Sequence, residues 1–257
     1  MHGLGNDFVV LDMITQSIKL HSAHVKRLSD RHLGIGCDQT LLVEPPINPD
    51  TDFYYRIYNA NGQEVEQCGI GACCAARFII DSGLINKTTL QADCIAGHVS
   101  FYKKNHRCIT ANFGQIHHEI NEHTIDIETL PNKIYSLSIG NPHGICIVPN
   151  IESILVNTCG KQLAALPHFP HQANITFMQI IDKYRVKLRV FERGIGKTFA
   201  CGSAACAATL VGQHLKLLGN TVTTCFEHGN LSILLNDERH LQMSCPATSV
   251  FAGHCKI

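Results

Sequence analysis

The chain has 257 residues, with 21 basic and 21 acidic side chains and therefore no formal net charge. This length fits one large or two ordinary domains, and the balanced charge gives no indication of binding to nucleic acid or to an anionic membrane surface. No apolar run approaches the ~18 residues of a membrane span, and the first residues lack the basic and apolar regions of a signal peptide. We therefore expect a cytoplasmic protein whose partner is a small molecule.

The first half of the chain predicts short strands and two helices. Apolar, β-branched and aromatic runs bounded by turn residues predict strands over residues 8–11, 40–43, 53–58 and 99–102. Helices are expected over residues 23–31 and 69–82.

The second half follows the same plan. Strands are predicted over residues 144–148, 176–181, 186–191 and 232–235, and helices over 160–166 and 202–217. The last helix is rich in alanine and leucine, which favour helix. One main helix per half among several strands predicts the α+β class rather than an alternating, doubly wound sheet.

A cysteine motif occurs twice in the chain. Residues 68–76 (CGIGACCAA) are echoed by residues 201–208 (CGSAACAA) at an offset of 133, and the upstream segments 56–59 and 189–192 align at the same offset without a gap. Further matches elsewhere have offsets of 135 and 132. A repeat of this length is too long for a solenoid unit and predicts a gene duplication. We place the halves at residues 1–117 and 118–257, with the last few residues expected to pack back on the first half.

Each repeat has a cysteine at the start of its helix. Free N–H groups and the helix dipole at such a position favour thiolate over thiol. A single cysteine in an alanine-rich helix is more often a packed core residue, but the matched positions of Cys68 and Cys201 favour function. If the halves face each other, one sulfur can take a proton from one face of a carbon while the other returns a proton to the opposite face.

The other cysteines and the histidines give no metal motif. The chain has thirteen cysteines and sixteen histidines, but no Cys-x-x-Cys and no H-E-x-x-H motif. We expect reduced thiols and no metal. Residues 194–198 (GIGKT) resemble the end of a phosphate-binding loop, but Phe191 stands where that motif needs glycine, which argues against nucleotide binding.

Several blocks, in family order and spanning positions 1 to about 210, resemble the diaminopimelate epimerases: MHGLGNDF (1–8), GIGCDQ (34–39), NANG (59–62), QCG (67–69), GNPH (140–143) and ERG through ACGS (192–203). The resemblance implies a cofactor-independent amino-acid epimerase of two homologous domains. Each domain would be a curved mixed or antiparallel sheet wrapped around a central helix, with the active site in the cleft between them. It also implies a homodimer.

The resemblance assigns roles to residues of this chain. Cys68 and Cys201 would be the thiolate and thiol, exchanging roles between stereoisomers, with His143 and Glu192 assisting them and the substrate amine. The backbone N–H groups after each cysteine would hold the α-carboxylate, and Arg193 would clasp the distal carboxylate. The implied substrate-binding residues are Asn6, Gln39, Asn59, Gly69, Ile70, Asn141, Asn174, Arg193, Gly202 and Ser203.

Departures from the family pattern keep other functions open. Ile70 stands where the family usually has asparagine, Cys73 replaces an arginine, Lys197 a glutamate and Ala205 a glycine. The leading hypothesis is epimerisation of LL-diaminopimelate to meso-diaminopimelate, which serves lysine and peptidoglycan precursor synthesis. One alternative is racemisation of a smaller acidic amino acid such as glutamate, alone or as a second activity, because an apolar side chain and a reversed charge near a polar pocket alter which substrate fits. Another is a ligand-binding relative that lost the two-thiol chemistry.

Overall fold

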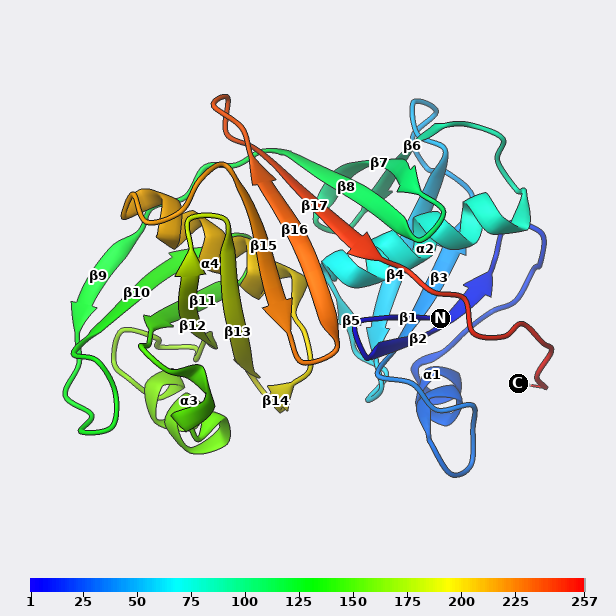
Figure 1. Ribbon diagram of the computed structural model, residues 1–257. Helices are drawn as coiled ribbons and strands as arrows, with labels where there is room; N and C mark the ends of the chain where they lie inside the picture. Colours follow the sequence, from blue (N-terminus) through cyan, green and yellow to red (C-terminus); the bar gives the residue numbers. More distant parts are fainter. Residues whose placement is uncertain (257) are drawn as a thin grey trace. The chain divides into compact units, whose positions relative to one another are not determined.

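The computed structural model describes residues 1–256 and divides the chain into two units (Figure 1). The first unit comprises Met1–Gly114 and the segment from Ser244 onward, and the second comprises Gln115–Met243. The chain therefore passes from one unit to the other twice. The predicted halves, residues 1–117 and 118–257, concern the gene duplication and stay a prediction.

The elements of the first unit are mostly strands. They are β1 (His2–Gly3), β2 (Asn6–Asp12), α1 (Ser22–Ser29), β3 (Gln39–Glu44), β4 (Phe53–Asn59), β5 (Glu64–Val65), α2 (Gly69–Ser82), β6 (Thr89–Cys94), β7 (Gly97–Asn105) and β8 (Cys108–Gln115). The last strand of the chain, β17 (His240–Pro246), begins in the second unit and ends in the first.

The second unit is built in the same way. Its elements are β9 (Asn121–Thr124), β10 (Lys133–Ser138), β11 (Pro142–Ile147), the 3₁₀ turn η1 (Ile151–Ser153), α3 (Val156–Ala164), β12 (Asn174–Asp182), β13 (Arg185–Glu192), β14 (Gly196–Thr198), α4 (Gly202–His214), β15 (Thr221–Phe226) and β16 (Gly229–Leu235).

Strand pairing shows that the two units share one topology. In the first unit β2 pairs parallel with β3, β3 antiparallel with β4, β4 parallel with β6, and β6 antiparallel with β7. In the second unit β11, β12, β13, β15 and β16 repeat this order of parallel and antiparallel pairs. The predicted α+β fold of two homologous, mixed-sheet domains is confirmed.

One helix lies at the centre of each unit. α2 contacts β1, β2, β3 and β4, and α4 contacts β10, β11, β12, β15 and β16 (Figure 1). Both helices are buried on most of their circumference, and most of their buried residues are alanine, cysteine and glycine. Small side chains bring a helix backbone close to a surrounding sheet, so these alanine-rich sequences suit a central position.

The two remaining helices lie on the outside, where α1 contacts β3 and α3 contacts β12, β13 and β14. The helix predicted over residues 160–166 begins earlier, at Val156. The helix predicted over 202–217 ends at His214, because Lys216 takes a left-handed conformation and the N–H groups of Leu217 and Leu218 both turn back to the carbonyl of Gly212. Across residues 1–256, no helix is both long and apolar enough to cross a membrane.

Candidate active site

The two matched cysteines occupy the same position in their helices. Cys68 is the N-cap residue of α2 and Cys201 is the N-cap residue of α4. Their backbone angles are nearly identical, with φ −141° and ψ 108° at Cys68 and φ −140° and ψ 120° at Cys201. Each cysteine therefore stands at the start of its helix, as the sequence predicted, and the sulfur of Cys68 accepts a hydrogen bond from the first turn of α2.

Two hydrogen-bond donors approach the sulfur of Cys68. The backbone N–H of Gly71 donates to Sγ at 3.4 Å, and the side-chain amide of Asn6 donates to it at 3.9 Å. Donors aimed at a sulfur stabilise its negative charge. Asn6, which the resemblance implied as a substrate contact, is thus placed against the cysteine.

Gln39 and Asn59 lie side by side on neighbouring strands of the first unit. They face each other across the β3–β4 pair, and Nε2 of Gln39 donates to Oδ1 of Asn59 at 2.9 Å. Within residues 1–256, the buried Oε1 of Gln39 has no hydrogen-bond donor. This carbonyl oxygen can accept a hydrogen bond from an ammonium group.

Ser203 is the polar neighbour of Cys201. The hydroxyl of Ser203 lies 3.4 Å from the sulfur of Cys201. Gly202 and Ser203 form the first turn of α4, so their N–H groups point out of the start of the helix, as do those of Gly69 and Ile70 in α2.

His143 is fully buried on β11 and carries no charge. Burial lowers the pKa of His143 from 6.5 to about 3. Its Nε2 lies 2.9 Å from Oδ1 of Asn141, and because that oxygen only accepts, Nε2 carries the proton. The other nitrogen, Nδ1, is then an acceptor, and it is buried with no donor among the described residues.

Asn174, Glu192 and Arg193 come together at the ends of β12 and β13. Oδ1 of Asn174 accepts a hydrogen bond from the backbone N–H of Arg193 at 2.9 Å. The hydroxyl of Thr198 donates to Oε1 of Glu192 at 2.6 Å. The exposed guanidinium of Arg193 donates to the carbonyl of His171 at 3.3 Å.

The strand registers identify which residues of the two units correspond. Phe8 pairs with Gln39 and His143 pairs with Asn174, so both residues of the second pair are 135 positions beyond those of the first. By the same comparison, Glu192 at the end of β13 corresponds to Asn59 at the end of β4. The second unit therefore carries ionisable side chains where the first carries a phenyl ring and an amide.

Gln67 and Thr198 contact candidate site residues but were not predicted from the sequence. Oε1 of Gln67 accepts from the backbone N–H of Cys68 at 3.0 Å, and Thr198 binds Glu192 as described above. Gln67 stood within a family-like block, but nothing in the sequence links its side chain to the backbone of the next residue.

Two of the departures from the family pattern have clear places in the fold. The side chain of Ile70 is fully buried and lies over Gly3, where a Cβ at position 3 would come within 2.4 Å of its Cγ2. The side chain of Ile70 is thus not available to a ligand. Lys197 forms an ion pair with Glu227 at 3.2 Å, and its backbone N–H donates to Oδ1 of Asn157 at 2.9 Å.

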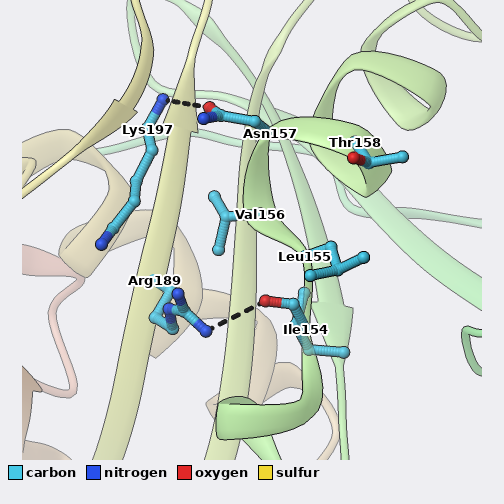
Figure 2. A pocket seen from close by; sticks show the side chains of 7 residues that line it. All are labelled: Ile154, Leu155, Val156, Asn157, Thr158, Arg189 and Lys197. Atoms are coloured by element: carbon cyan, nitrogen blue, oxygen red, sulfur yellow. Dashed lines mark hydrogen bonds between the residues drawn. The ribbon is translucent and has the colours of Figure 1, made fainter.

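A pocket of about 230 Å³ lies elsewhere in the second unit (Figure 2). It is lined by Ile154, Leu155, Val156, Asn157, Thr158, Arg189 and Lys197. Arg189 donates to the carbonyl of Ile154 at 3.0 Å, so its guanidinium ties η1 and α3 to β13 (Figure 2). None of the site residues implied by the resemblance lines this pocket. Nor do residues 1–256 place three or more His, Cys, Asp or Glu side chains where they could hold a metal ion.

Comparison with known proteins places this geometry in a class. The sequence model of the family described as diaminopimelate epimerase matches residues 1–118 and 135–250. The chain is 41% identical to a diaminopimelate epimerase of Teredinibacter turnerae, covering 100% of this chain and 98% of the relative. It is 42% identical to one of Acinetobacter baylyi, covering 100% and 96%.

Solved structures share the fold at much lower identity. A hydroxyproline epimerase from Agrobacterium vitis matches with a TM-score of 0.71 and 12% identity over 98% of this chain and 89% of the other. A phenazine biosynthesis protein from Bacillus anthracis matches with a TM-score of 0.68 and 18% identity over 96% and 92%. The fold agrees with the family match and the full-length relatives, which show an isomerase of the epimerase and racemase class. Within that class, the chain belongs to the diaminopimelate epimerase family.

Proposed function

We propose that this protein epimerises LL-diaminopimelate to meso-diaminopimelate at one α-carbon, without a cofactor. The observation that carries the proposal is the matched pair of N-cap cysteines, Cys68 on α2 and Cys201 on α4, in a chain of this family. The reaction would serve lysine and peptidoglycan precursor synthesis in the cytosol. The homodimer that the resemblance implies stays a prediction.

The chemistry is a two-base proton transfer. One cysteine acts as thiolate and removes the α-proton, while the other acts as thiol and delivers a proton to the opposite face of the same carbon. The cysteine that starts as thiolate ends as thiol, and the other ends as thiolate, so the reverse reaction exchanges their roles. The negative charge that builds on the substrate between the two transfers must be stabilised by nearby donors.

The surroundings of Cys68, His143 and Glu192 support these roles. Gly71 and Asn6 donate to the sulfur of Cys68, so they stabilise the thiolate form. His143 is neutral, and its Nδ1 can accept a hydrogen bond from a thiol or from the substrate ammonium group. Glu192 accepts a hydrogen bond from the hydroxyl of Thr198, and its carboxylate can also accept one from a thiol or from the substrate ammonium group.

Substrate binding is assigned to backbone and side-chain groups of both units. The N–H groups of Gly69 and Ile70, and those of Gly202 and Ser203, would bind the α-carboxylate, since helix N-termini favour anions. The exposed guanidinium of Arg193 would bind the distal carboxylate. Amide groups of Gln39, Asn59, Asn141 and Asn174 complete the set of proposed polar contacts.

The proposal is tested by proton NMR in deuterium oxide. Wild type, Cys68→Ala and Cys201→Ala are incubated separately with LL-diaminopimelate and L-glutamate, and loss of the α-proton signal is followed together with stereochemistry. Wild type should exchange the α-proton of diaminopimelate with inversion, and each alanine variant should lose at least about 10³-fold of that rate because one of the two proton carriers is gone.

Cys255→Ala provides the matched control, because Cys255 is an exposed free thiol far along the chain from both helices. It should keep the wild-type rate. Faster exchange of glutamate than of diaminopimelate would replace the proposed substrate with a smaller acidic amino acid. Exchange of neither compound by wild type would leave a ligand-binding relative as the better description.

A further inference from the structure

The side chain of Gln67 connects the start of α2 with the core of the first unit. Its Oε1 accepts two hydrogen bonds, one from the backbone N–H of Cys68 and one from the hydroxyl of Tyr55, both at 3.0 Å. Its Nε2 donates to the sulfur of Cys94 at 3.5 Å. Every polar atom of this side chain therefore has a partner, and the amide can take only one orientation.

Tyr55 makes this arrangement rigid. Its side chain is fully buried and packs against the rings of Phe53 and Phe101, with ring centroids 6.1 and 6.4 Å away. Burial raises the pKa of Tyr55 well above its usual value of 10, so the hydroxyl stays protonated and donates at every physiological pH. Oε1 of Gln67 therefore accepts its hydrogen bond from a hydroxyl that packing holds in place.

The geometry holds Cys68 from two sides. Gln67 binds the backbone N–H of Cys68 outside the helix, and Gly71 donates its N–H to the sulfur from within the first turn. The acceptor outside the helix is neutral. A carboxylate at the same place would be a like charge close to a thiolate and would disfavour it.

The second unit has no equivalent of this arrangement. At the offset of 133 residues, Gln67 corresponds to Ala200 and Tyr55 corresponds to Leu188. Neither side chain can accept or donate a hydrogen bond. Cys201 therefore serves as an internal reference that Gln67 should not affect.

We propose that Gln67 is a positioning residue for Cys68: its neutral amide oxygen fixes the main chain of that cysteine so that the sulfur stays at the start of α2 and carries negative charge. The role rests on the proposed two-thiol function, but it concerns only Cys68 of the two cysteines.

The test uses three variants of the full chain. Gln67→Met keeps the length of the side chain and removes the acceptor, and Gln67→Glu keeps an acceptor and adds a charge. Gln63→Met changes an exposed glutamine on the other side of β5 and is the matched control. For each, kcat and KM are measured with LL-diaminopimelate. The rates at which iodoacetamide alkylates Cys68 and Cys201 are measured by peptide mapping between pH 6 and pH 10.

A positioning role predicts different results for the two cysteines. Gln67→Met should lower kcat by about tenfold with KM changed by less than about twofold, since the loss of a hydrogen bond that positions a reacting residue costs about that factor. Gln67→Glu should move the alkylation profile of Cys68 upward by about one pH unit, because a like charge disfavours the thiolate. The profile of Cys201, and both profiles in Gln63→Met, should match wild type.

Other results would overturn the proposal. A folded Gln67→Met variant with wild-type kcat and a wild-type Cys68 profile would show that the amide does no positioning. Equal changes at Cys68 and Cys201, together with a lower Tm, would assign Gln67 a purely structural role. Because alkylation needs no substrate, these arms still decide the role of Gln67 if diaminopimelate proves not to be turned over.

Discussion

At the scale of single residues, His143 shows how burial sets the protonation state of a proposed catalytic group. The ring lies in the interior of the second unit, with Nε2 bound to Asn141 and with burial holding its pKa near 3. Protonation would place a charge where water cannot reach it. His143 is therefore a neutral hydrogen-bonding group at neutral pH and not a cation that attracts a carboxylate.

This burial predicts a pH dependence of stability. The folded-state pKa of about 3 lies below the ordinary value of 6.5, so the unfolded chain binds more protons between these values. The contribution of His143 is fully present above pH 6.5 and is lost as the pH falls, by about 2 kcal/mol between pH 6.5 and 5. Urea unfolding across this range should give a flatter pH dependence for His143→Gln than for wild type.

His106→Gln is the control for this experiment, because His106 is exposed. Its stability should change with pH as wild type does. Parallel curves for wild type and His143→Gln would contradict the account of His143.

The sequence could predict many candidate site residues but few of their contacts. Motif matches and the repeat pointed to both cysteines, to His143 and to the amide residues. The contact between Asn6 and Cys68 joins residues 62 positions apart, and Gln67 reaches Tyr55 across 12 positions. Ile70 was expected beside a polar pocket, whereas its side chain packs over Gly3. Such contacts depend on how strands and helices meet, which residue order alone does not determine.

At the scale of elements, α3 shows that helix propensity alone does not predict where a helix begins or which residues it contains. The helix begins at Val156, and its N-cap residue, Leu155, makes no side-chain cap, so the usual start signal is absent. Gly160 lies inside the helix because the backbone comes very close to Phe191, the residue before Glu192. A glycine that normally weakens a helix is here required by packing.

This close approach predicts the effect of Gly160→Ala. A Cβ at position 160 would lie 2.4 Å from the Cβ of Phe191, so α3 must move away from β13. We expect a loss of about 1 to 3 kcal/mol in the free energy of unfolding and lower activity, since Glu192 follows directly. Chemical denaturation with parallel kinetics measures both.

Lys161→Ala, on the exposed face of the same helix, should change neither quantity. An unaltered denaturation midpoint for Gly160→Ala would show that the gap between α3 and β13 widens without cost.

Strands were predicted less completely than helices. The expected strands overlap β2, β3, β4, β7, β11, β12, β13 and β16, but β1, β5, β6, β8, β9, β10, β14, β15 and β17 were missed. In β17 the signal was present, because Leu241, Met243 and Cys245 alternate with polar residues and are all buried. Cysteine and methionine are not among the typical strand-forming residues, so this alternation was not recognised as a strand.

At the scale of the whole molecule, the predicted duplication rests on an offset between matching residues that stays near 133. The strand registers repeat at almost the same offset, with Cys94 opposite Gly97 in one hairpin and Phe226 opposite Gly229 in the other. Topology was not predictable to the same extent, since several of the pairing strands carried no recognised pattern.

The segment after Met243 should be required by the first unit. The hydroxyls of Ser244 and Thr110 lie 2.8 Å apart. Ala247 donates its N–H to the carbonyl of Arg107 at 3.1 Å. His2 and Thr248 exchange two backbone hydrogen bonds of 2.9 Å. A chain ending at Met243 loses all of these. Hydrogen exchange should then speed up in β8 and β1 by at least about tenfold, because unpaired strands open readily.

A chain ending at Ser249 keeps every one of these contacts and should exchange like wild type. Peptides of the second unit should be unaffected in both. Unchanged protection of β8 in the shorter chain would show that the first unit is stable without its last strand.

The interrupted first unit also determines the order of events on the ribosome. Domains usually fold as they emerge, beginning with the N-terminal one. Here the second unit is one continuous stretch, Gln115–Met243, and is fully synthesised before Ser244 is added. Most residues of the first unit are synthesised earliest, but the unit cannot be completed at that stage. The edge of β8 that pairs with β17 is still uncovered. The N-terminal part of this protein is thus the last to be completed, and the chain carries an open strand edge until residues 244–248 have left the ribosome.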